Sequence, residues 1–69
     1  MGSIRERAYE IGRTTVFTES QAMTAAALIS ESHPDQVDAI RVLDAMANLA
    51  LVNRRPLVDV TLWYLGVAT

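Results

Sequence analysis

The segment from Val37 to Val52 constrains the fold of this 69-residue chain more than any other part of it. On a helical wheel, its polar side chains gather within an arc of roughly 120°. They are Asp38, Arg41, Asp44 and Asn48. Most of the remaining circumference is apolar and consists of Ala39, Ile40, Val42, Leu43, Met46, Ala47, Leu49, Ala50 and Leu51. A surface helix buries a stripe of about 100°, whereas this one is apolar over about twice that arc, so we infer that a second protein surface helps to cover it.

The size of the chain leads to the same inference. A domain of 69 residues is close to marginal stability and usually needs a disulfide, a metal or a partner chain as reinforcement. The sequence has no cysteine and one histidine, which excludes disulfides and leaves too few ligands for structural zinc. Association is therefore the remaining route, and the apolar content of 51% is consistent with it. We expect a single all-α domain over residues 1–69, a small bundle of three or four helices.

Local sequence signals indicate where three helices begin in the first 53 residues. We predict helices over residues 4–11, 19–30 and 34–53. Ser3 and Glu6 have the spacing of a capping box, and Thr18 and Gln21 repeat it. Gly12 is placed to end the first helix in a left-handed conformation. Proline is tolerated at the first position of a helix, so the third helix is expected to start near residue 34 as the central element of the bundle.

The segment over residues 57–65 allows two interpretations. Pro56 precedes it, as it often precedes a helix. Its valines and Thr61 are poor helix formers, however, and apolar residues alternate along it as in a strand. We predict a helix, and a strand remains the alternative.

The sequence contains no motif that identifies a reaction, a cofactor or a substrate. Its three glycines lie far apart, which excludes a glycine-rich phosphate loop. His33, Asp35 and Asp38 form the one cluster with the character of a metal or acid–base site, but they are an incomplete ligand set. The two aspartates are explained by the start of a helix, whose dipole favours carboxylates there. We therefore expect no enzymatic activity, no cofactor and no metal site.

The apolar helix and two short clusters supply the candidate interface. Arginine, tryptophan and tyrosine are enriched in interface hot spots, which draws attention to the pair Arg54 and Arg55 and the pair Trp63 and Tyr64. Each pair also has a structural interpretation: the arginines could cap the end of the third helix, and the aromatic residues could pack in the core. The full set of candidate interface residues is Leu28, Ile40, Leu43, Met46, Ala47, Leu51, Arg54, Arg55, Trp63 and Tyr64.

The leading functional hypothesis is a small self-associating interaction module without chemistry of its own. It would act by protein–protein contact, as an adaptor, an inhibitor or a toxin-like modulator, and as a homodimer by default or a higher oligomer. Another protein is a second kind of partner. The chain is short and contains neither cysteine nor lysine, and in composition only it resembles small accessory proteins of GC-rich bacteria or their phages.

Two other classes of function are weaker hypotheses. The helices on either side of residues 32–34 could form a helix-turn-helix that binds DNA, but Asp35 and Asp38 would then face phosphates, and the net charge is −2. Binding at a membrane surface is disfavoured because the polar face of the third helix carries more acid than base. The amino-terminal residues are charged without a following apolar run, so we expect no signal peptide and a cytoplasmic location.

Overall fold

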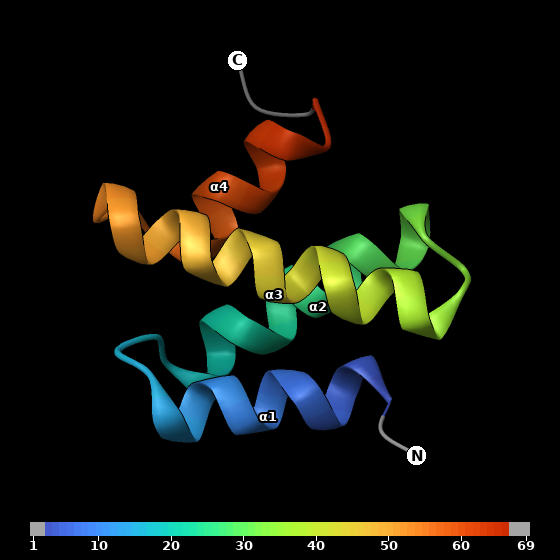
Figure 1. Ribbon diagram of the computed structural model, residues 1–69, viewed down its shortest axis with the longest axis horizontal. Coiled ribbons are helices and arrows are strands. Elements are labelled where there is room, and N and C mark those ends of the chain that lie inside the picture. The colour runs from blue at the N-terminus through green and yellow to red at the C-terminus, as the bar shows by residue number, and fades with distance from the viewer. Residues whose placement is uncertain (1–2, 67–69) are drawn as a thin grey trace.

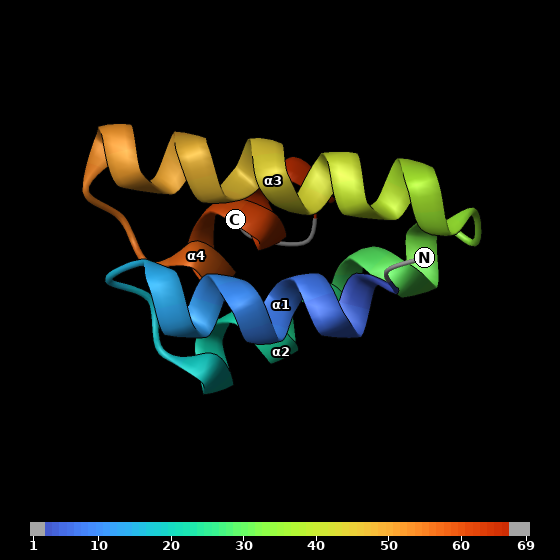
Figure 2. The ribbon, with the colours of Figure 1, turned by 60° about the horizontal axis from the view of Figure 1, so that its bottom comes forward.

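The computed structural model describes residues 3–66, which form four α-helices (Figure 1). They are α1 (Ile4–Thr14), α2 (Glu19–Ser32), α3 (Gln36–Asn53) and α4 (Leu57–Tyr64). α1 and α3 lie side by side and run in the same direction (Figures 1 and 2). α2 and α3 each contact all the other helices, whereas α1 and α4 do not contact each other. The expected all-α bundle is confirmed, and residues 3–66 contain no strand.

α1 begins with the predicted capping box but extends beyond its predicted end. Ser3 Oγ accepts a hydrogen bond from the Glu6 amide at 3.2 Å, and Glu6 Oε1 accepts one from the Ser3 amide at 3.4 Å. The helix continues through Gly12 to Thr14, so the prediction of a left-handed helix end at Gly12 was wrong. A Cβ at position 12 would lie 2.7 Å from Glu19 Cα. Glycine is therefore required here because the start of α2 passes close to the backbone of α1.

α2 packs against its neighbours through small side chains. Thr18 Oγ1 caps the helix by accepting a hydrogen bond from the Gln21 amide at 3.2 Å. Gln21 does not complete the predicted capping box, because its side-chain oxygen accepts instead from the Val58 amide of α4 at 3.1 Å. The buried face of α2 consists of Ala22, Ala25, Ala26 and Ile29. With three alanines on that face, neighbouring helices can approach α2 closely.

α3 starts two residues later than predicted and ends where predicted. Asp35 is the N-cap, and its Oδ1 accepts a hydrogen bond from the Val37 amide at 2.9 Å. At the other end, Arg54 adopts the left-handed conformation (φ 55°) that usually favours glycine. The Arg55 amide then donates to the carbonyl of Ala50 at 3.0 Å. This closing turn directs the chain from α3 into α4.

The segment over residues 57–65 is helical through Tyr64, which resolves the two interpretations in favour of the predicted helix. The buried residues are Leu57, Val60 and Thr61, at helical rather than alternating spacing. Thr61 Oγ1 donates a hydrogen bond to the Leu57 carbonyl at 2.9 Å, so this buried hydroxyl is satisfied. Pro56 supplies no side-chain cap, and the bond from the Val58 amide to Gln21 on α2 takes that role.

Polar contacts tie α1 to α3. The Ile4 amide donates to Gln36 Oε1 at 2.8 Å, and Arg7 Nε donates to Asp44 Oδ1 at 2.7 Å, while Arg7 also pairs with Glu10. The hydrogen bond to Asp44 raises the pKa of the Arg7 guanidinium, and the neighbouring carboxylates add to that effect against partial desolvation. Because the shift is upward, the charged guanidinium stabilises the fold at neutral pH, and this contribution falls as the pH rises through the raised pKa of Arg7.

The chain covers more of α3 than its sequence led us to expect. The buried side chains of α3 are Ala39, Leu43, Met46, Ala47 and Ala50. With half-buried Ile40 and Val42, they span roughly 160° of the helix, an arc that α1, α2 and α4 cover together. Leu49, Leu51 and Val52 remain exposed on the same helix. Val37 is also exposed near the start of α3, so the exposed apolar side chains of this helix lie mainly, but not entirely, in its carboxyl-terminal part.

Candidate interaction surface

A groove lies between the carboxyl-terminal half of α3 and the outer side of α4. Its volume is about 440 Å³, and we call it the α3–α4 groove. It is lined by Leu49, Asn53, Arg55, Asp59, Val60 and Trp63. Leu49 and Asn53 are one turn apart on α3, and Asp59 and Trp63 are one turn apart on α4, so each helix supplies one wall. Figure 1 shows α4 crossing α3 at an angle and leaving the body of the bundle.

The groove carries the largest exposed apolar side chains of this part of the molecule. Trp63 is 67% exposed, and Leu49 opposite it is 36% exposed. Val52 lies beside Leu49, three residues further along α3, and is 80% exposed. Scattered exposed apolar residues are normal in soluble proteins, but a contiguous patch with a polar border is typical of an interaction site.

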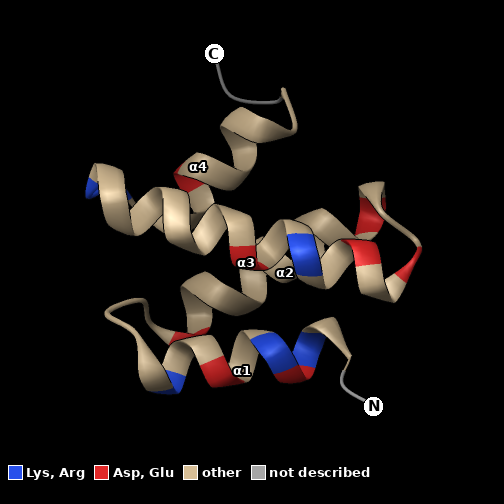
Figure 3. Ribbon diagram, in the orientation of Figure 1, with Lys and Arg blue, Asp and Glu red and all other residues tan. Residues whose placement is uncertain are grey.

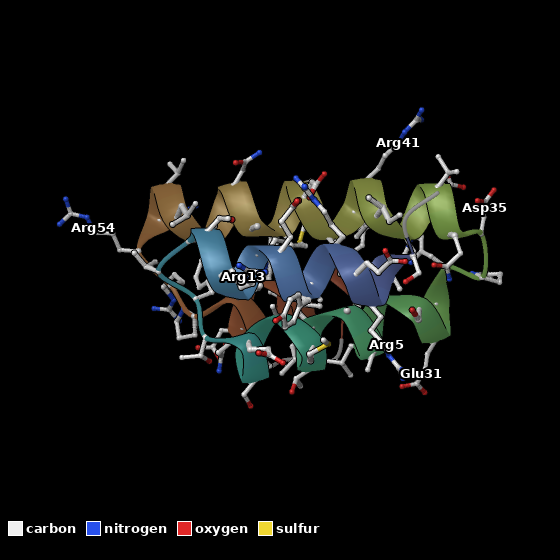
Figure 4. The ribbon with its side chains drawn as sticks, turned by 90° about the horizontal axis from the view of Figure 1, so that it is seen from below. Arg5, Arg13, Glu31, Asp35, Arg41 and Arg54 are labelled. Carbon is white, nitrogen blue, oxygen red and sulfur yellow. The ribbon has the colours of Figure 1, made fainter. Side chains whose placement is uncertain are left out.

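Charge is sparse around the groove (Figure 3). Between Ala45 and Gly66 the charged residues are Arg54, Arg55 and Asp59. Arg54 points away from the end of α3 into solvent, and Arg41 points away from the same helix nearer its start (Figure 4). Arg55 and Asp59 line the groove itself and are exposed. Both ion pairs within residues 3–66 involve Arg7, so neither charge of the groove has an ion-pair partner among these residues.

The structure divides the candidate interface residues between core and surface. Leu43, Met46 and Ala47 are buried inside the chain, and Leu43 is fully inaccessible. They form the core under α3 and contribute nothing to an outer surface. Leu28 and Ile40 are half-buried.

The remaining candidates are exposed, but they do not form one surface. Arg55 and Trp63 line the α3–α4 groove, and Arg54 lies beside it at the end of α3. Leu51 is 41% exposed and faces a separate depression between α1 and α3. Tyr64 stacks on the ring of His33, with 6.0 Å between ring centroids, and so packs α4 against the turn that follows α2.

Four residues of the groove were absent from the candidate set: Leu49, Asn53, Asp59 and Val60. Leu49 belongs to the apolar arc of α3 in the wheel, and that pattern could have identified it. Asp59 and Val60 could not have been found in this way, because the direction of α4 was undecided from sequence. Val52 lies within the polar arc of the wheel, where an exposed valine is itself a signal.

The residues around His33 make contacts that support the fold. Asp35 caps α3, and His33 stacks on Tyr64 with its Nδ1 3.3 Å from the Ile29 carbonyl. Within the part of the chain that the structure describes, no three His, Asp or Glu residues are grouped closely enough to hold a metal ion. Exposed Asp35 and Asp38 place negative charge at the start of α3, where a helix-turn-helix would contact DNA phosphates.

No family model, curated protein or solved structure is significantly similar to this chain. None of the helices in residues 3–66 combines the length and the apolar character that crossing a membrane requires. The function is therefore inferred from the geometry and chemistry of the α3–α4 groove.

Proposed function

We propose that this protein is a self-associating interaction module that binds through the α3–α4 groove and carries out no chemistry of its own. The observation that supports the proposal most directly is the exposure of Trp63 beside Leu49 and Val52. Tryptophan in an apolar groove with a polar border is the kind of residue on which interface energy concentrates. When this side chain packs against another protein surface, a large apolar area is removed from contact with water.

The size of the groove sets the expected strength of association. Stable interfaces involve about 20–30 residues on each side, and a groove lined by six residues is well below that size. We therefore expect a reversible complex with a dissociation constant on the order of micromolar, rather than an obligate oligomer.

A pair of valine substitutions tests the proposal. Val52, beside the groove residues Leu49 and Asn53 on α3, is 80% exposed, and Val16 between α1 and α2 is 82% exposed. Val52→Glu brings a carboxylate into the association surface, so we expect affinity to fall about tenfold or more, because burying an unpaired charge is costly. Val16→Glu makes the same chemical change away from the groove and should leave affinity unchanged. Sedimentation equilibrium from micromolar to millimolar concentration measures both.

Trp63 offers a second readout because it is the one tryptophan of the chain. Its emission should shift to shorter wavelength as the wild-type concentration rises, since association removes the ring from water. Val52→Glu should delay that shift to higher concentration. A monomer mass across the whole range, or equal weakening by both valine variants, would contradict the proposal.

A further inference from the structure

The α3–α4 groove holds one basic and one acidic side chain, and the two lie close together in the chain. Arg55 precedes α4, and Asp59 is in its first turn, four residues later. Both are exposed, and neither makes an ion pair within its own chain in residues 3–66. A surface with one unpaired charge of each sign beside an apolar ring is complementary to a copy of itself.

We propose that the groove binds a second copy of this chain about a two-fold axis, with Arg55 of each copy facing Asp59 of the other. This inference rests on the proposed function and specifies its partner and its register. A two-fold interface is made of the same patch on both copies, so each contact occurs twice. Two matched ion pairs then form from groups that have no other partner in this part of the molecule.

The placement of Trp63 agrees with this register. Asp59 and Trp63 are one turn apart on α4, and Arg55, which precedes the helix, lines the same groove. When Arg55 faces Asp59 across the axis with the two α4 helices antiparallel, Trp63 extends past the partner's ion pair. It then reaches the end of the partner's α3, where Val52 and Asn53 are exposed. The charges set the register, and the tryptophan supplies most of the buried apolar area.

An alternative register would place the two Asp59 residues opposite each other and Arg55 over the partner's Trp63. That arrangement gains a cation–π contact but brings two carboxylates together. Like charges across an interface oppose association and help to exclude wrong registers. The opposite-charge register avoids this repulsion.

Charge exchange between two variants tests the inference. Arg55→Glu leaves two acids in the groove, and Asp59→Arg leaves two bases, so each variant alone should self-associate about tenfold more weakly than the wild type. An equimolar mixture should recover much of the wild-type affinity, because the mixed dimer pairs an acidic groove with a basic one. The double variant Arg55→Glu/Asp59→Arg should also recover, since the two signs are simply exchanged.

Three further variants serve as controls for the pairing across the axis. Arg54→Glu changes the neighbouring arginine, which points into solvent, and should leave affinity within about twofold of the wild type. Arg55→Gln and Asp59→Asn remove each charge without reversing it and should weaken association less than the reversals do. Far-UV circular dichroism confirms that each variant retains its helices.

Each outcome of the exchange decides the question. Recovery of the double variant without recovery of the mixture would mean that Arg55 and Asp59 pair within one chain, and it would overturn the inference. Recovery of the mixture alone, or failure of both to recover, would indicate another register or a different partner at the groove, and it would overturn the inference as well. The proposed function survives these results if Val52→Glu still weakens association, whereas a wild-type protein that stays monomeric refutes both.

Discussion

Gly12 is the residue at which helix propensity and packing are most directly opposed. In the interior of a helix, alanine is favoured over glycine by about 1 kcal/mol. At this position, however, a Cβ would come within 2.7 Å of Glu19 Cα and 3.0 Å of Glu19 N, which are backbone atoms that cannot rotate away. A methyl group would push the start of α2 away from α1.

We therefore expect Gly12→Ala to lower the free energy of unfolding by about 1–3 kcal/mol, the usual cost of overpacking. Urea denaturation followed by circular dichroism measures the change. The matched control is Ala27→Gly at an exposed position inside α2, where propensity alone should lower stability by about 1 kcal/mol. A more stable Gly12→Ala variant would show that the two helices can separate at no cost.

At the scale of single elements, α4 depends on a cap supplied by another helix. Pro56 offers no side-chain acceptor, and Gln21 Oε1 on α2 accepts the hydrogen bond of the Val58 amide. Gln21→Met keeps the length of the side chain but removes the acceptor, so we expect the protein to lose about 1 kcal/mol of stability. Gln21→Glu keeps an acceptor and adds negative charge at the amino-terminal end of α4, and it should retain wild-type stability.

Hydrogen exchange resolves the effect to the element. In Gln21→Met, the amides of α4 should exchange faster than in the wild type, while those of α1 keep their protection. Uniformly faster exchange in all helices would mean that Gln21 stabilises the bundle as a whole rather than α4 in particular.

α4 also shows which part of the fold the sequence alone could not decide. The starts of α1 and α2 follow from local signals, since Ser3 and Thr18 cap the amides three residues ahead of them. The helical state of residues 57–64 was decided by contacts from elsewhere, namely the Gln21 bond and the burial of Leu57. A cap from α2, 37 residues away in the chain, leaves no trace in the local pattern.

At the scale of the whole molecule, the helical wheel showed that α3 is unusually apolar. It could not show which neighbouring helix covers each side chain. Leu43 and Leu49 look alike in the sequence, and the first is fully buried whereas the second lines the groove. That difference depends on where α4 crosses α3, which no local spacing records. The candidate site was therefore found only in part, through Arg55 and Trp63.

Leu43→Glu separates folding from association at this scale. Leu43 has no exposed surface, and a buried unpaired charge costs several kcal/mol, comparable to the whole stability of a small domain. We expect the variant to lose its helices even at dilution, where the proposal has the wild type monomeric, as circular dichroism would show. A variant that stayed helical and lost only self-association would place Leu43 at the interface and contradict its burial in the core.

The lack of contact between α1 and α4 has a consequence for any pair formed through the groove. α4 would face the twin molecule, and α1, with its arginines and glutamates, would remain on the far side of each copy. Such a pair would be bivalent, because it would display two equivalent charged faces on its outer sides. A third molecule that binds the charged face of α1 weakly could then bind both copies at once. The avidity of the two linked contacts would exceed the affinity of either contact alone.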